Sequence, residues 1–323
     1  MAGFAQIVFL IPSLKKSQFK YRTVLDFKDP YARRMGKLSI PVIFSTIVSE
    51  ATVIVNKSLA TWLPAGSVTY LTYGELIHFT IMMVFISSMS MMLFPALSRA
   101  FARKQLERAH RYLGLAYNAI LIVTIPLAIY VGIFAKDIVT ILFQRGLFTS
   151  IDTLNTAKIV SVYAFCLPAF SIMRITTNAY HANKDTRTPA IFSFMLLILN
   201  ILFTLILIRF MGVSGIPLAS GISCIFVTTC LNILLKKKQG YVFFSRSFVS
   251  TAIKVVIASA VCLLFMTIGK LIFQNYISNI LYKNLTFIVL SLLTLLLYLL
   301  VGHLLKIKEF RSIIRTIKHK FSS

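Results

Sequence analysis

The chain has 323 residues, of which 58% are hydrophobic and 13% charged, and its mean hydropathy is +0.83. Soluble domains carry about a quarter charged residues, so this composition excludes an ordinary soluble globular protein and favours a membrane protein. The formal net charge of +25 is also compatible with nucleic-acid binding, which the placement of Lys and Arg argues against below.

Eight apolar runs are long enough to cross about 30 Å of hydrocarbon, which takes about 20 helical residues. In chain order they are Leu38–Leu63, Leu71–Leu97, Tyr112–Phe134, Ala157–His181, Pro189–Phe210, Val213–Leu235, Phe248–Phe273 and Leu285–Leu305. A ninth run, Met1–Leu14, is too short to span and is interpreted as a stub or the end of a longer helix. No basic stretch precedes it, so no cleavable secretory signal is expected. The sequence therefore predicts an all-α polytopic membrane protein with eight transmembrane helices and a short N-terminal helix stub.

Lys and Arg are concentrated in alternate loops. The basic segments are 13–37, 98–111, 236–248 and the tail after Leu305, and the nearly neutral ones are 64–70, 135–156, 211–212 and 274–284. This alternation is the positive-inside pattern, so the basic loops and the C-terminus are predicted to be cytoplasmic. The expected partner of these residues is the anionic face of a bilayer, and no nucleic acid is expected.

Ionisable residues inside the spans are the main functional signal, because burying them in hydrocarbon is costly unless they are paired or hydrated. Glu50, Lys57, Glu75 and Arg174 therefore argue against a sealed apolar bundle and are expected to face each other or a water-filled cavity. Arg174 lies about two turns from its helix end, which argues against snorkelling to the interface. A structural Arg174, bonded to carbonyls of a neighbouring helix, is the alternative.

A polar stripe follows one face of the span that contains Arg174. Its members are Tyr163, Arg174, Asn178 and His181. No catalytic constellation, phosphate-binding Gly loop or metal cluster accompanies it, so neither an enzyme nor a metal site is predicted. The four cysteines all lie inside spans and are interpreted as buried thiols; they are Cys166, Cys224, Cys230 and Cys262.

Three motifs occur in order within Ile141–Pro189: F-x-R-G-x-F, L-P-A-F and D-T-R-T-P. Together with the stretches Ala5–Pro41 and Leu63–Arg99, they resemble the lipid II flippase family, MurJ (also called MviN), of the multidrug/oligosaccharidyl-lipid/polysaccharide exporter superfamily. The resemblance is close from Ala5 to about Leu235 and looser over the last two spans.

The resemblance implies fourteen transmembrane helices in two pseudo-symmetric lobes of six, followed by two C-terminal helices. This chain would hold the end of the sixth helix and the seventh to fourteenth helices, without the N-terminal lobe. The expected parts are a truncated helix (1–14), a basic cytoplasmic linker (15–37), a six-helix C-terminal transporter lobe (38–235), a basic cytoplasmic loop (236–247), two accessory helices (248–305) and a basic cytoplasmic tail (306–323).

The resemblance also implies a substrate site. Family arginines that face the central cavity are thought to hold the pyrophosphate of the lipid carrier, and the forked guanidinium suits phosphate oxygens. The eighth helix of the family usually starts Y-A-D-R, whereas here Glu75 keeps the acid and Leu76 replaces the arginine. Arg174 is then the best candidate for an anion contact, with Glu75, Asn178 and His78 as further substrate-binding residues. Ordinary interfacial packing is the alternative for His78.

A cation site is implied on the seventh, eleventh and twelfth helices of the family. The matching positions are Asn56, Asn200, Thr204, the Ile216 carbonyl and Ser220. Asn56 and Thr204 stand at positions where Asp is found among relatives, and without a carboxylate the affinity for Na⁺ should drop. Hydrogen bonding between helices is the alternative role.

The function implied is a lipid II flippase of the bacterial inner membrane that works by alternating access. Its substrate would be a polyprenyl-pyrophosphate-linked sugar, and no cofactor is expected; Na⁺ and the membrane potential are the candidate driving forces. One lobe cannot enclose a cavity, so a separate N-terminal half or a second copy would be needed. An inactive fragment, a membrane scaffold and a flippase for another polyprenyl-linked glycan remain as alternatives.

Overall fold

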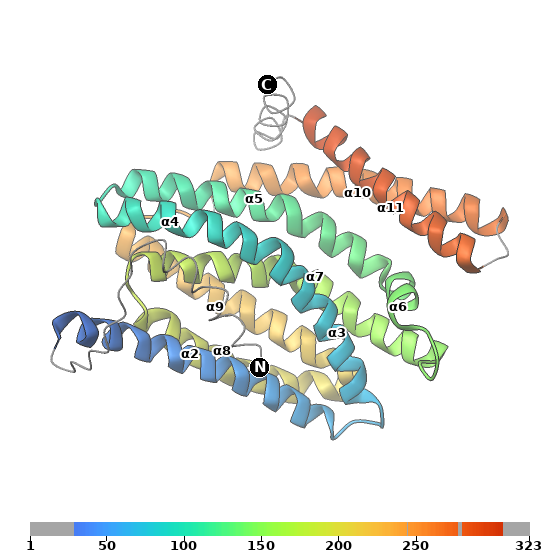
Figure 1. Cartoon of the computed structure of the whole chain (residues 1–323), viewed down its shortest axis with the longest axis horizontal. Helices are drawn as coiled ribbons and strands as arrows, with labels where there is room; N and C mark the ends of the chain where they lie inside the picture. Colours follow the sequence, from blue (N-terminus) through green and yellow to red (C-terminus); the bar gives the residue numbers. More distant parts are fainter. Residues whose placement is uncertain (1–28, 244, 277–279, 306–323) are drawn as a thin grey trace, which may run out of the picture. The chain divides into compact units, whose positions relative to one another are not determined.

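The computed structural model describes residues 29–243, 245–276 and 280–305, and every regular element in those ranges is a helix (Figure 1). The all-α class predicted from the sequence is therefore confirmed for the described residues. The predicted stub 1–14, most of the linker 15–37 and the tail 306–323 lie outside them.

The elements follow one another through short connections. In chain order they are α2 (Pro30–Ala60), α3 (Ser67–Ile81), the π-helix η1 (Met82–Ser87), α4 (Ser88–Ala102), α5 (Leu106–Ile133), α6 (Ala135–Phe143), α7 (Ser150–Ala182), α8 (Arg187–Met211), the 3₁₀ turn η2 (Gly212–Ser214), α9 (Gly215–Gln239), α10 (Arg246–Tyr276) and α11 (Ile280–Leu304).

Seven segments of the described chain are long and apolar enough to cross a membrane, compared with the eight predicted. The difference arises in Arg187–Gln239, a single segment of 53 residues. It contains α8 and α9, which meet at η2 and pack extensively along one another. Another segment, Ser67–Ala102, runs through α3, η1 and α4 without a break.

The short helix α6 was not predicted, since the sequence reading treated 135–156 as a loop. It has 9 residues, too few to span a bilayer, and it buries Ala135 and Val139 against α7 and α5. Apolar runs of about 20 residues cannot indicate a helix as short as this one.

Helix α7 begins seven residues before the predicted start at Ala157 (157 − 150 = 7). A capping box explains the extension: the Thr149 hydroxyl accepts the Asp152 amide, and the Asp152 carboxylate accepts the Thr149 amide at 2.7 Å. The other Asp152 oxygen accepts the Tyr70 hydroxyl at 2.8 Å, which joins the starts of α3 and α7. Capping satisfies backbone donors that would otherwise lack partners at a helix end.

The chain divides into two compact units, Met1–Ile40 and Pro41–Ser323. All contacts between helices described below lie within the second unit. The sequence expectation of a six-helix lobe with two accessory helices stays a prediction.

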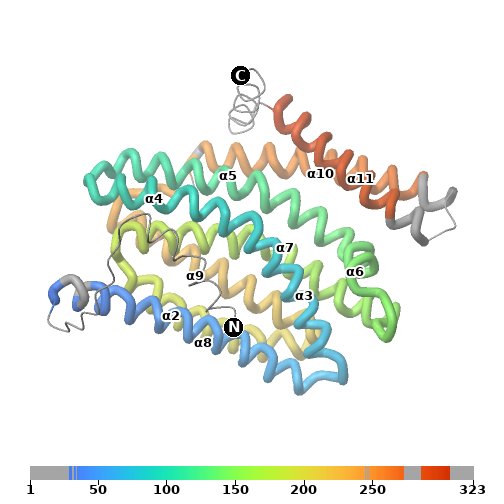
Figure 2. The backbone as a smooth tube through the Cα atoms, in the orientation of Figure 1, coloured from blue at the N-terminus to red at the C-terminus, as the bar shows by residue number. Residues whose placement is uncertain are grey.

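The main core lies where α4, α5, α7 and α9 pack together, and Figure 2 shows α5 and α7 running side by side. A buried polar group joins three of these helices. The Tyr117 hydroxyl lies 2.8 Å from Thr176 Oγ1 and donates to Asn232 Oδ1 at 3.2 Å. The Asn232 amide in turn donates to Thr176 Oγ1 at 3.2 Å. Such a satisfied network fixes the rotation of α5, α7 and α9 relative to one another.

The bundle has two chemically distinct ends. We call the end with the turns 103–105 and 183–186 and the C-terminus of α9 the basic end, because Lys and Arg cluster there. We call the end with the connections 61–66, 144–149 and 212–214 the neutral end. Three cysteines are buried as predicted, but Cys230 is partly exposed.

Candidate functional site

The polar stripe of α7 is the centre of the candidate site. Arg174 follows Tyr163 by eleven residues, which is about three turns, so the two side chains leave α7 on one face about 16 Å apart along the axis. Asn178 and His181 continue this face towards the basic end, and both are partly exposed. The structure therefore keeps the predicted stripe on a single helix face.

Arg174 is exposed and makes no hydrogen bond or ion pair with the residues that the structure describes. The alternative of a structural arginine bonded to neighbouring carbonyls receives no support from these contacts. A guanidinium without a carboxylate partner keeps all its donors for another anion. Arg174 is the residue of the predicted set that is chemically ready to receive phosphate oxygens.

Glu75 lies at the contact of α3 with α7, with only 9% of its side chain exposed. Its Oε2 lies 3.5 Å from the Lys57 ammonium of α2, and its Oε1 accepts the Tyr163 hydroxyl at 3.4 Å. Glu50, which lies seven residues before Lys57 on α2, is exposed, and it is Glu75 that pairs with Lys57. Lys57 and Glu75 are thus the pair that relieves the cost of burying charge here.

His78 is packed between aromatic rings one turn along α3. Its ring stacks on Tyr163 at 4.9 Å and meets the edge of Phe170, also at 4.9 Å. Its Nδ1 is buried and has no hydrogen-bond partner among the described residues. Leu76, at the position of the family arginine, is more than half exposed.

Hydrogen bonds join four of the five predicted cation-site residues between α2, α8 and α9, and Thr204 lies one turn after Asn200 on α8. Ser220 Oγ accepts the amide of Asn200 at 2.7 Å and that of Asn56 at 3.4 Å, and it donates to the Ile216 carbonyl at 3.1 Å. Within the described chain, Asn56 Oδ1, Asn200 Oδ1 and Thr204 Oγ1 are buried without a partner.

These oxygen atoms test whether the site fits Na⁺. Hard oxygen donors suit the ion, and three of them have no hydrogen bond to give up. No carboxylate among them offsets the charge of a cation, so the residues fit a weakly held Na⁺. The hydrogen bonds to Ser220 also join three helices, which is the alternative role that the sequence left open.

An apolar cavity of about 500 Å³ lies between α5, α10 and α11. Its walls are mostly aliphatic and aromatic, with a few hydroxyl groups that are already bonded. Tyr298 donates to the Ile122 carbonyl at 2.7 Å, and Tyr130 contacts Ser291. The cavity can therefore accommodate an apolar chain, but its lining has, among the described residues, no free polar group that could bind a charged headgroup.

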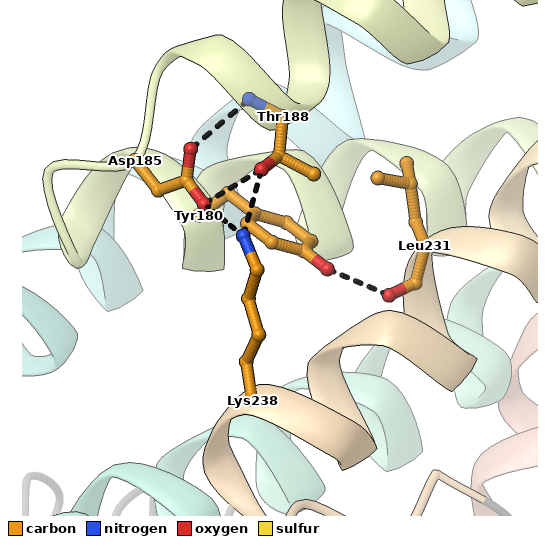
Figure 3. Close-up of polar contacts among 5 residues, drawn as sticks. All are labelled: Tyr180, Asp185, Thr188, Leu231 and Lys238. Atoms are coloured by element: carbon orange, nitrogen blue, oxygen red, sulfur yellow. Dashed lines mark hydrogen bonds and ion pairs between the residues drawn. The ribbon is translucent and has the colours of Figure 1, made fainter.

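A group of polar contacts at the basic end links the turn 183–186 and the start of α8 to the end of α9 (Figure 3). Asp185 accepts the Thr188 amide at 3.0 Å and the Thr188 hydroxyl at 2.7 Å, which caps α8. Lys238 of α9 donates to Asp185 at 3.0 Å and to Thr188 at 3.1 Å. Nearby, Tyr180 donates to the Leu231 carbonyl at 2.8 Å, which ties α7 to α9.

The ionisation of Asp185 reflects two opposing influences. Partial burial favours the neutral acid, but the bonds from Thr188 and Lys238 favour the carboxylate and hold the pKa of Asp185 below its ordinary value. The sequence reading missed this pairing. Lys238 is one of three consecutive lysines that were interpreted only as membrane-facing charge, and the signal available was the D-T-R-T-P motif itself.

Comparison with known proteins gives a consistent result. The family model described as "Lipid II flippase MurJ" matches residues 1–290. The probable lipid II flippase MurJ of Rickettsia prowazekii is 26% identical over 223 residues, which are 69% of this chain and 44% of that protein. The Thermotoga maritima protein of the same name is 27% identical over 319 residues, which are 99% of this chain and 61% of that protein. The chain spans about half the length of the curated relatives it matches.

Solved structures agree with the family match. The structure titled "Lipid II flippase MurJ, inward closed conformation" matches with a TM-score of 0.70 and 25% identity, over 95% of this chain and 60% of the other. An outward-facing transporter of the multidrug resistance MATE family has a TM-score of 0.57 at 14% identity, over 73% and 53% of the two chains, which shows similarity of fold alone.

Proposed function

This chain belongs to the lipid II flippase MurJ family, and from that premise we propose that it forms one lobe and the accessory helices of a lipid II flippase. The substrate is a lipid-linked peptidoglycan precursor, and a second six-helix lobe completes the transport cavity. The observation that carries the proposal is Arg174, an exposed arginine on the polar face of α7 that has no partner among the residues the structure describes.

The physical reason for such a protein lies in its substrate. A sugar pyrophosphate headgroup cannot cross hydrocarbon unaided at a useful rate, because its charges and hydroxyl groups lose their hydration. A hydrated cavity with a fixed guanidinium replaces part of that hydration, since Arg holds phosphate oxygens through two parallel hydrogen bonds. The proposed activity moves the headgroup and breaks no covalent bond.

We propose eight crossings, with α8 and α9 each crossing once, in the inner membrane of a bacterium. The close packing of α8 on α9 supports two passes within the 53-residue segment. The clustering of Lys and Arg at the basic end supports a cytoplasmic location for that end and for the C-terminus.

The isoprenoid tail of the substrate stays in an apolar environment throughout. The cavity between α5, α10 and α11 supports this part of the proposal, because its volume of about 500 Å³ is bounded by apolar side chains. The two accessory helices therefore serve to guide the tail while the lobe handles the headgroup.

The driving force is a choice between a Na⁺ gradient and the membrane potential. The oxygens of Asn56, Asn200 and Thr204 that have no partner in the described part of the chain support weak Na⁺ binding. The missing carboxylate favours the membrane potential as the main source of energy, since a translocated charge gains about 2.3 kcal/mol per 100 mV.

Complementation tests the proposal. Cells depleted of their own flippase would receive this chain with and without a cognate N-terminal lobe. Lipid II would then be measured on the outer face of the inner membrane. Growth and surface lipid II are expected only with the pair, and Arg174→Gln should abolish both while Lys158→Gln should not. Lys158 is exposed on another face of α7 and serves as the matched control. Normal growth with Arg174→Gln, or failure of the complete pair, would refute the proposal and favour a membrane scaffold.

A further inference from the structure

Glu75 is a poor ligand for pyrophosphate, because its carboxylate repels the anion. Its neighbour Lys57 is the cation at this position. The Lys57 ammonium lies 3.5 Å from Glu75 Oε2, well beyond the roughly 2.7–2.9 Å of a charge-assisted hydrogen bond. The Lys57 side chain is 38% exposed, against 9% for Glu75. The pair is therefore loose, and its cation is the accessible half.

The carboxylate half of the pair is confined by the packing of α3 on α7. Its second oxygen accepts only a long hydrogen bond from Tyr163, at 3.4 Å, but the two helices lie very close together at the preceding residue. A Cβ added to Gly74 would lie 2.5 Å from Ile159 Cγ2. The cationic half comes from α2, where the preceding turn leaves Ile54 exposed. Lys57 has room to change partner, and Glu75 does not.

The two cations of the site lie at two different levels along α7. Lys57 reaches the level of Tyr163 through Glu75, and Arg174 lies about 16 Å further along α7 towards the basic end. Phe170 and His78 pack together between these levels. Arg174 has no carboxylate partner in the described chain, whereas the ammonium of Lys57 lies 3.5 Å from a Glu75 oxygen.

We propose that Lys57 is a second contact for the anionic headgroup, which reaches it after Arg174. Glu75 is then the counter-ion that pairs with Lys57 again once the headgroup has left. This inference rests on the proposed function and concerns the pyrophosphate part of the substrate. A headgroup that arrives at Lys57 competes with Glu75, so its affinity there is lower than at Arg174. Strong capture near the basic end and weak capture near the neutral end favour release at the neutral end.

A binding experiment on the full chain in nanodiscs tests this with farnesyl pyrophosphate as the probe and farnesol as the uncharged control. Glu75→Gln removes the competitor and should tighten binding of farnesyl pyrophosphate about five- to tenfold. The double variant Lys57→Gln with Glu75→Gln should lose that gain, and Arg174→Gln should weaken binding more than tenfold. Lys158→Gln should bind like the wild type. Thermal unfolding of each variant identifies any that fails to fold.

A purely structural ion pair predicts a different pattern. Glu75→Gln would then bind the probe no more tightly than the wild type although it folds, and the double variant would behave like Glu75→Gln. Either result overturns the role of Lys57 and leaves the proposed function standing. If Glu75→Gln fails to fold, Lys57→Met gives the answer, since unchanged binding by that variant also overturns the inference. Failure of the wild type to bind farnesyl pyrophosphate more tightly than farnesol also overturns the inference, whereas the complementation experiment with the N-terminal lobe decides the proposed function separately.

Discussion

The contact between α3 and α7 at Gly74 allows a sharp prediction about stability. An alanine methyl at this position would lie 2.5 Å from Ile159 Cγ2, whereas carbon atoms prefer about 3.5–4.0 Å. The helices must therefore separate by about 1.0 to 1.5 Å (3.5 − 2.5 and 4.0 − 2.5). The atom that is struck belongs to a stiff β-branched side chain, which is itself almost fully buried. Overpacking of this kind costs about 1–3 kcal/mol, partly offset by about 1 kcal/mol of helix propensity.

We expect Gly74→Ala to lower the free energy of unfolding by about 0–2 kcal/mol and to weaken binding of farnesyl pyrophosphate, because Glu75 follows directly. The measurements are chemical unfolding in detergent and the nanodisc binding assay. Gly114→Ala is the matched control, since an added Cβ there has its nearest neighbour, Tyr241 Oη, 4.0 Å away. That helical glycine should tolerate alanine or gain stability. Gly74→Ala with the stability of Gly114→Ala would show that α3 and α7 are not in close contact.

Three further predictions concern other parts of the bundle. Because the pKa of Asp185 is lowered in the folded state, its bonds stabilise the protein above the unfolded pKa of about 3.9 and this contribution fades as pH falls below that value. Asp185→Asn should therefore lower the melting temperature at pH 7 but much less at pH 3, and an equal loss at both values would contradict this. Tyr117→Phe should cost about 1–2 kcal/mol in chemical unfolding, because it leaves the buried Asn232 Oδ1 without its donor; no change would mean that the network is not formed. Asn56→Asp should make the melting temperature rise with Na⁺ but not with K⁺, since it places a carboxylate beside Asn200 Oδ1 and Thr204 Oγ1, which have no partner among the described residues. An equal response to both ions would argue against a site there.

Hydropathy predicted most of the helical framework, because a membrane span must be a continuous apolar helix. The errors have physical causes. The helix α6 is too short for that signal, and the true start of α7 depends on the capping pair Thr149 and Asp152. The predicted count of eight spans is not confirmed, because η2 joins α8 and α9 with so short a break that they form one apolar segment of the described chain.

The candidate site was predictable in its members more than in its pairings. The face of α7 with Tyr163 and Arg174 follows from helical periodicity. The pair of Lys57 and Glu75 joins different helices, and nothing in the spacing along the chain distinguishes Glu75 from Glu50 as the partner of Lys57. The contact of Asp185 with Lys238 was hidden for the same reason. Clustering of Asn56, Asn200 and Ser220 came from family resemblance, and the hydrogen bonds among them agree with it.

The central claim is that Arg174 faces a water-filled cavity that is open to solvent. Arg174→Cys in a chain whose native cysteines are replaced by serine tests it most directly, with a charged thiol reagent that does not enter lipid. Phe165→Cys is the control, since Phe165 is exposed on the opposite face of α7. The account predicts rapid labelling at position 174 and little labelling at position 165. Labelling at 174 that is as slow as at 165 would contradict it.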